Sequence, residues 1–309
     1  MTKVTFRRAL GVGASVAFSR AEPVLLLGLA ALASTLCTSL LWLNGLATLV
    51  DDGARARFLG LLVAAAAAWL LEAAILGGAV QQFARGLRGK EVPPLLLAMT
   101  SAAPRALGWA VLAGAALLTW LAWQVLVGAS GFLLFLRGLF HGSGGLVGAL
   151  ALALVATVGP LGAFFLQLVV EMALVRSVAR EEAPAVALYE SARGLLARPW
   201  VPVGLLVLTA LLAAALAGTA AALSGMGPST SLRLLRGAAA LQLAIASLAS
   251  ALALLVRLGA FVALELGRSG ELPEVAVPPA SLVPRADLVG AGEGVLEARA
   301  VEPSPRGGV

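Results

Sequence analysis

The chain has 309 residues, of which 60% are apolar and 12% are charged, and its mean hydropathy is +0.97. A soluble globule cannot hide that much apolar surface, and disordered, collagen-like and coiled-coil chains have other compositions. One His and one Cys exclude an internal disulfide and argue against zinc, haem and iron–sulfur sites. The composition predicts an integral membrane protein without cofactors.

The chain is basic, with a net charge of +6. In a membrane protein such an excess reflects loops that face the cytoplasm and contact anionic lipid headgroups. No basic run is interleaved with aromatic residues, as a nucleic-acid groove requires. We therefore expect anionic headgroups at the cytoplasmic face as a partner and no nucleic acid.

Six apolar runs are long enough to cross the hydrocarbon core, which takes about 20 residues of helix. The runs are rich in Leu, Ala and Val without strand-like alternation, so they are expected to be helices. The predicted fold is an all-α polytopic membrane bundle over residues 1–268, followed by a disordered cytoplasmic tail over 269–309. The six spans lie at about 24–50, 58–82, 106–127, 145–175, 201–223 and 237–266.

The loops differ in basic residues, which sets the orientation. Twelve Lys and Arg residues lie on the side of the N-terminus, and five lie on the opposite side. Positive loops remain in the cytoplasm, so we expect both termini there and the chain in the bacterial cytoplasmic membrane.

The cytoplasmic segments recur with a similar plan. An amphipathic stretch and an arginine precede the first, third and fifth spans, and a basic residue follows the second, fourth and sixth. The spacing between the arginines is 85 and 93 residues, and each basic residue follows its arginine by 70 or 71. The plan predicts three repeats of an amphipathic helix followed by a helical hairpin. The residues are Arg20, Arg105, Arg198 and Lys90, Arg176, Arg268.

This layout resembles the six-span membrane domain attached to some bacterial glycerophosphodiester phosphodiesterases, and related uncharacterised membrane families. The resemblance covers residues 1 to about 268. It is carried by Arg7-Arg8-Ala9-Leu10, Arg20-Ala21-Glu22-Pro23, Ala192-Arg193-Gly194-Leu195-Leu196 and Arg198-Pro199. The family's catalytic TIM barrel is a separate domain with no counterpart here, so the resemblance implies no catalytic residue.

The third amphipathic stretch has the clearest pattern. Val186, Tyr189 and Leu196 share one helical face, and Pro184 suits a first helical turn. Such a helix either lies in the headgroup plane or packs on the bundle, and the two placements are compatible.

Two charged residues fall near the middle of the membrane. Counted back from Arg85 and Arg268, Glu72 and Arg257 lie about 20 and 17 Å deep at ~1.5 Å per residue. Since unpaired charges are costly there, we predict an ion pair between the second and sixth spans. It serves either as a structural lock or as a charged site in a polar cavity. Otherwise Arg257 snorkels to the headgroups and Glu72 is protonated.

Two further carboxylates lie nearer the cytoplasmic boundary. Glu171 is expected to pair locally with Arg176, and Glu265 with Arg268. We find no candidate catalytic, cofactor-binding or metal-ligating residue. The sequence thus favours a non-catalytic accessory or assembly module with a membrane protein partner. The alternative is a small-solute or lipid transporter, or a permease subunit, that uses the mid-membrane charges.

Overall fold

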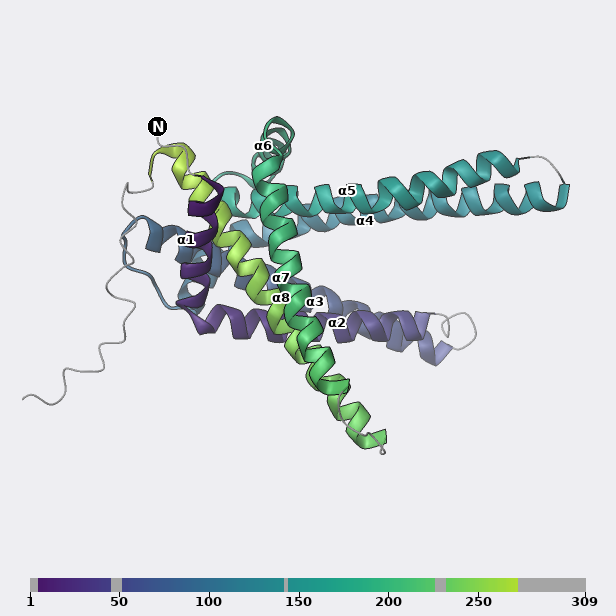
Figure 1. Cartoon of the computed structure of the whole chain (residues 1–309), viewed down its shortest axis with the longest axis horizontal. Helices are drawn as coiled ribbons and strands as arrows, with labels where there is room; N and C mark the ends of the chain where they lie inside the picture. The colour runs from purple at the N-terminus through teal and green to yellow at the C-terminus, as the bar shows by residue number, and fades with distance from the viewer. Residues whose placement is uncertain (1–4, 46–51, 142–143, 226–231, 272–309) are drawn as a thin grey trace, which may run out of the picture. The chain divides into compact units, whose positions relative to one another are not determined.

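The computed structural model describes residues 5–45, 52–141, 144–225 and 232–271, and every regular element among them is an α-helix (Figure 1). The chain divides into two units, 1–276 and 277–309, and the second lies outside the described residues. The predicted disordered tail therefore lies almost entirely beyond what the structure describes.

The described residues form eight helices. They are α1 (Phe6–Phe18), α2 (Ala21–Gly45), α3 (Asp52–Leu87), α4 (Leu95–His141), α5 (Gly145–Ala179), α6 (Pro184–Ala197), α7 (Trp200–Gly225) and α8 (Leu232–Ser269).

Five of these helices, namely α2, α3, α4, α5 and α8, are long and apolar enough to cross a membrane. A sixth span is counted when α6 and α7, which meet at a 96° bend, are taken together. The predicted fold class, an all-helical polytopic membrane protein, is confirmed.

The long helices pair as three hairpins, α2 with α3, α4 with α5 and α7 with α8, whose partners lie side by side (Figure 1). The second helices of the hairpins, α3, α5 and α8, also contact one another pairwise. Their buried residues gather toward their C-terminal ends, at 73–84, 168–179 and 247–266. The protein core, and with it the charged residues discussed below, therefore lies where these three helices meet.

The short helices pack on second helices through small residues. On α1 the buried residues are Ala9, Gly13 and Ala17, spaced four apart on one face. A Cβ on Gly13 would lie 2.3 Å from the carbonyl oxygen of Val256 on α8, so the two backbones touch. Close backbone contact of this kind is what small residues permit between helices in membranes.

The second amphipathic stretch is not a separate helix, because α4 runs unbroken from Leu95 through Pro104. Proline removes one backbone hydrogen bond and usually kinks a helix. Here α4 packs closely on α3 on both sides of the proline. A Cβ on Gly77 of α3 would meet the Cβ atoms of Ala106 at 2.6 Å and Ala102 at 3.4 Å.

The third span also extends past its expected end at residue 127, since α4 continues to His141. The reason is a close contact with α5 instead of a turn. A Cβ on Gly148 would lie 2.2 Å from the backbone nitrogen of Phe135, and one on Gly131 would lie 2.8 Å from the Cβ of Ala151. Gly131 and Gly148 let α4 and α5 pack closely on each other beyond residue 127.

Candidate functional site

Arg257 on α8 is a buried charge of the core, and its partner is Glu171 on α5. The guanidinium donates from Nε to Oε2 at 2.5 Å and from Nη2 to Oε1 at 2.5 Å, a two-point contact between planar groups. Only 5% of Arg257 and 8% of Glu171 are exposed. A charge in this position is costly unless it is paired, and this pair neutralises both residues.

Two neighbours complete the hydrogen bonding of the pair. The Arg257 Nη1 donates to the hydroxyl of Thr209 on α7 at 3.0 Å, and that hydroxyl donates onward to the carbonyl of Leu205 at 2.7 Å. Gln167, one turn before Glu171, donates its amide to Oε1 at 3.0 Å. The pair therefore joins three helices, α5, α7 and α8.

The predicted pairing of Arg257 with Glu72 is corrected by this geometry. Glu72 on α3 is half-buried and makes no hydrogen bond or ion pair with any residue that the structure describes. The estimate of depth assumed that every helix meets the membrane boundary at its last basic residue. Glu171 appeared too shallow on that scale, whereas the contacts show that it lies level with Arg257.

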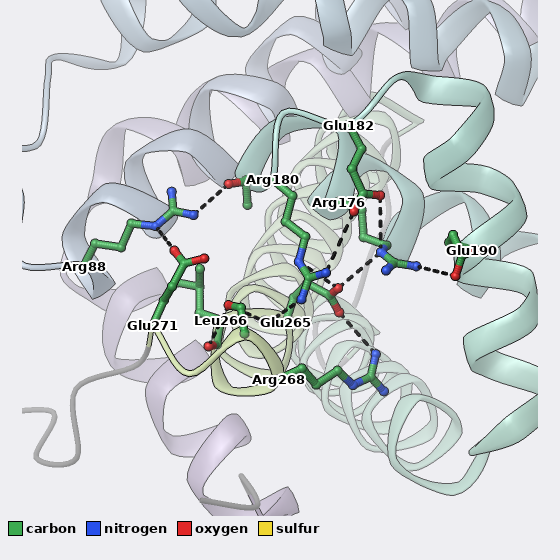
Figure 2. A network of polar contacts seen from close by, with 11 residues as sticks. Arg88, Arg176, Arg180, Glu182, Glu190, Glu265, Leu266, Arg268 and Glu271 are labelled. Carbon is green, nitrogen blue, oxygen red and sulfur yellow. Dashed lines mark hydrogen bonds and ion pairs between the residues drawn. The ribbon is translucent and has the colours of Figure 1, made fainter. Parts of the chain in front are cut away.

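A second group of charges lies toward the C-terminal ends of α5 and α8 (Figure 2). Its centre is Glu265, which is 4% exposed. Its carboxylate lies 3.2 Å from Nε of Arg176, 3.1 Å from Nε of Arg180 and 3.1 Å from Nη1 of Arg268. We call these four residues, together with Glu182 and Glu190, the Glu265 cluster.

The remaining carboxylates of the Glu265 cluster balance the arginines. Arg176 also lies 3.5 Å from Glu182 and 3.8 Å from Glu190, and Arg180 lies 3.8 Å from Glu182. Three arginines thus face three glutamates, so the cluster as a whole is neutral. It differs from a strongly polarised site that would attract ions of one sign.

The two interfacial pairs expected from the sequence have different outcomes. Arg268 contacts Glu265 one turn away on α8, as expected. Arg176 does not contact Glu171, because Glu171 points toward α8 and is held by Arg257. The local pair is replaced by contacts between helices.

The two charged layers have a reciprocal order. Helix α5 presents Glu171 and then Arg180, nine residues later, while α8 presents Arg257 and then Glu265, eight residues later. Eight or nine residues of helix rise by about 12–14 Å, and both contacts form across that rise, Glu171 with Arg257 and Arg180 with Glu265. Opposite charges in opposite order therefore fix the alignment of α5 and α8.

Arginines also bind the C-terminal carbonyls of neighbouring helices (Figure 2). Arg88, just after α3, donates to the carbonyl of Ala179 on α5 at 2.9 Å, and Arg180 donates to the carbonyl of Glu265 on α8 at 3.2 Å. Positive side chains are favourable at helix C-termini because the last carbonyls have no partners within the helix.

Arg88 also holds Glu271 beyond α8, with Nε 2.6 Å from Oε2. The hydrogen bond from Arg88, together with its charge, holds the pKa of the Glu271 carboxyl below its usual value of 4.5. Arg88, Arg180, Glu271 and neighbouring residues line an open pocket of about 440 Å³. Its mixed charges suit ion pairs within the protein more than a ligand of one sign.

Sequence reasoning missed Thr209, Arg180, Glu182 and Glu190. The reciprocal spacing on α5 and α8 is a signal that could have found the register, whereas nothing in the sequence singles out Thr209 among the other hydroxyl residues. Over the parts of the chain with a described structure, no three His, Cys, Asp or Glu side chains are grouped so that they could hold a metal ion.

Comparison with models of known protein families, with curated proteins and with solved structures finds no match. The class of the protein therefore rests on its own helices. The chain is an integral membrane protein whose buried charges tie its hairpins together.

Proposed function

We propose that the chain is a non-catalytic accessory or assembly module of the bacterial cytoplasmic membrane. The observation that carries this is the state of the buried charges. Arg257 is 5% exposed and is hydrogen-bonded to Glu171 and Thr209, so its charge is paired within the protein. A transporter that used Arg257 to bind a solute would need it to face a cavity.

Catalysis is not part of the proposal. The carboxylates that could act as acids or bases at the helix ends, Glu265 and Glu182, are held by arginines of the Glu265 cluster. Groups fixed in this way support structure, since a general base needs free access to the proton that it removes.

The chain is built of three structural repeats, each an amphipathic segment followed by a helical hairpin. The first short helix, α1, packs on α8, the N-terminal part of α4 packs on α3, and α6 packs on α5. The second and third amphipathic segments thus contact the second helix of the preceding hairpin. The first contacts the second helix of the last hairpin, so the pattern closes on itself. This arrangement supports a threefold repeat of an amphipathic segment followed by a helical hairpin.

The connections after the second helices support the same repeat. A Glu, an apolar residue and a Pro stand at 91–93, 182–184 and 271–273. Just before each motif a residue adopts positive φ, as helix ends often require: Gly89 at 69°, Glu181 at 60° and Gly270 at 75°.

The chain is oriented across the membrane with both termini in the cytoplasm. Five arginines that the charge bias assigns to the cytoplasm lie at or near the C-terminal ends of α3 and α5 and in α6. Most of them pair with glutamates. The arginines are Arg85, Arg88, Arg176, Arg180 and Arg193.

The test is purification of the full chain from native membranes in mild detergent, with identification of co-purifying membrane proteins and lipids. We expect a membrane protein at constant stoichiometry with wild type and with Glu72→Gln, a variant outside both charged layers. The contrary result is a chain that purifies alone and transports a solute into proteoliposomes in a manner that Arg257→Gln abolishes.

A further inference from the structure

Helix α6 has two different faces. One face is buried against α5 and carries Ala187, Ser191 and Leu195, spaced four apart. The opposite face is exposed and carries large residues at spacings of three and four. These residues, which we call the α6 stripe, are Val186, Tyr189, Arg193, Leu196 and, at the start of α7, Trp200.

The exposure of the α6 stripe is unusually high for such side chains. Tyr189 is 67% exposed, Leu196 is 73% exposed and Trp200 is 83% exposed. A soluble surface would rarely leave these groups in water, and an apolar stripe with a Tyr and a Trp is typical of the boundary between water and lipid.

The bend between α6 and α7 gives the direction of the stripe. The two helices meet at 96° across the link Arg198-Pro199. Helix α7 is apolar along its length, so where it crosses the bilayer near the normal, α6 lies close to the membrane plane. Trp200, the first residue of α7, then sits at the depth of the headgroups.

The charges on this helix favour anionic lipid. The side chain of Arg193 is 73% exposed and only 4.0 Å from Glu190, at the limit of an ion pair. Arg198 is exposed and its side chain makes no hydrogen bond or ion pair with the described residues. Basic side chains near a membrane surface are drawn to anionic lipids.

We propose that the α6 stripe seats α6 in the headgroup layer and that Arg193 and Arg198 bind anionic phospholipid headgroups there. This deepens the lipid contact expected from the net charge by naming the helix and residues. It does not depend on whether the chain is an accessory module or a transporter.

The other short helix provides a matched control. Helix α1 also packs through small residues, but its exposed face carries Arg7, Gly11 and Ser15, and its one large exposed apolar residue is Phe18 at the C-terminal end. A probe on α1 at Ser15 should therefore face water, while one on α6 at Tyr189 should face lipid.

The experiment uses the full chain in lipid nanodiscs made with and without phosphatidylglycerol. Cys37 is the only cysteine, so Cys37→Ser allows a fluorophore to be placed at Tyr189→Cys or at Ser15→Cys. Quenching is measured with iodide in the water and with lipids that carry a nitroxide near the headgroup. We expect the nitroxide lipids to quench the probe at position 189, and iodide to quench the probe at position 15.

The headgroup preference is measured with nitroxide phosphatidylglycerol against nitroxide phosphatidylcholine. We expect an association ratio of about fivefold or more at position 189, falling toward one in Arg193→Gln/Arg198→Gln and unchanged in Arg7→Gln. Each variant is first checked for a single gel-filtration peak.

Three results would overturn the proposal. The first is iodide quenching at position 189 without quenching by lipid. The second is an equal response to both headgroups that the arginine variants do not change. The third is a probe at position 189 that is shielded from iodide in native membranes but not in nanodiscs, since that would identify a protein as the group that covers the stripe. The nanodisc assay uses purified protein alone, so its outcome is separate from the search for a membrane protein partner.

Discussion

The two charged layers between α5 and α8 are built in opposite ways. In the deeper layer, Glu171 and Arg257 depend on each other through a single two-point contact. In the Glu265 cluster, one glutamate faces three arginines, two of which also contact other glutamates. Both layers are neutral, but the first concentrates its stability in one pair, whereas the second distributes it. The layers should therefore respond differently to the loss of one member.

The largest effect is expected for Glu171→Gln. The change leaves the guanidinium of Arg257 buried without its counter-charge, and breaking a buried pair from one side costs about 3–5 kcal/mol. The free energy of unfolding is measured by titrating detergent-solubilised protein with a denaturing detergent.

The double variant Glu171→Leu/Arg257→Met sharpens this prediction. It removes both charges at similar volume and should cost less than either single change, because no charge remains unpaired. Glu72→Gln is the matched control and should change the free energy of unfolding by less than about 1 kcal/mol, since Glu72 has no partner in the described structure. Additive single effects, or a Glu72→Gln as damaging as Glu171→Gln, would contradict the assignment.

A smaller loss is expected for Glu265→Gln. Three arginines lose one partner each, but Arg176 and Arg180 keep Glu182 and Arg176 also keeps Glu190. The loss of the hydrogen bond from Arg268 and of the ion pairs with Arg176 and Arg180 should cost about 1.5–3 kcal/mol. The same unfolding titration checks it, and a cost equal to that of Glu171→Gln would show that the cluster does not distribute its stability.

These two layers also show how far the sequence can be interpreted. The hairpin count and the helical class follow from apolar run length, which depends only on local composition. The partner of Arg257 does not follow from composition, because it depends on how far α5 is shifted along α8. A shift of one turn, about 5.4 Å, exchanges one carboxylate for another. Depth along the sequence favoured Glu72 and assigned Glu171 to Arg176, whereas the packing of α5 on α8 places Glu171 against Arg257.

The helix ends give a similar lesson. Gly128 and Gly131 have the composition of a loop, and the third span was expected to end before them. Gly131 on α4 and Gly148 on α5 instead let the two helices approach closely, and both helices continue past that point. Whether a glycine ends a helix or brings two together depends on the partner helix.

Removing one arginine from the Glu265 cluster should have less effect still. In Arg268→Gln, Glu265 keeps Arg176 and Arg180, so we expect a cost of no more than about 1 kcal/mol. Arg176→Gln/Arg180→Gln should cost more than the sum of its single changes, because Glu265 then keeps only the half-exposed Arg268. Strict additivity in the unfolding titration would mean that the arginines act independently.

The smallest effect belongs to the ion pair of Arg88 with Glu271, at the exposed edge of the same region. The side chain of Glu271 is 43% exposed, and exposed pairs contribute at most about 1 kcal/mol. We choose Glu271→Gln because Arg88 keeps its contact with the carbonyl of Ala179 in that variant. Thermal unfolding of wild type and variant in detergent is compared from neutral to acidic pH.

The sign of the pH dependence follows from the depressed pKa of Glu271. As the pH falls, the unfolded chain takes up its proton near 4.5, whereas the folded chain keeps the carboxylate paired with Arg88 to lower pH. The stabilisation is therefore present above 4.5 and is lost as the pH falls through the folded value. The gap between wild type and Glu271→Gln should close over that window and should shrink with added salt. A gap that is constant with pH would mean that Glu271 acts through packing instead of through its charge.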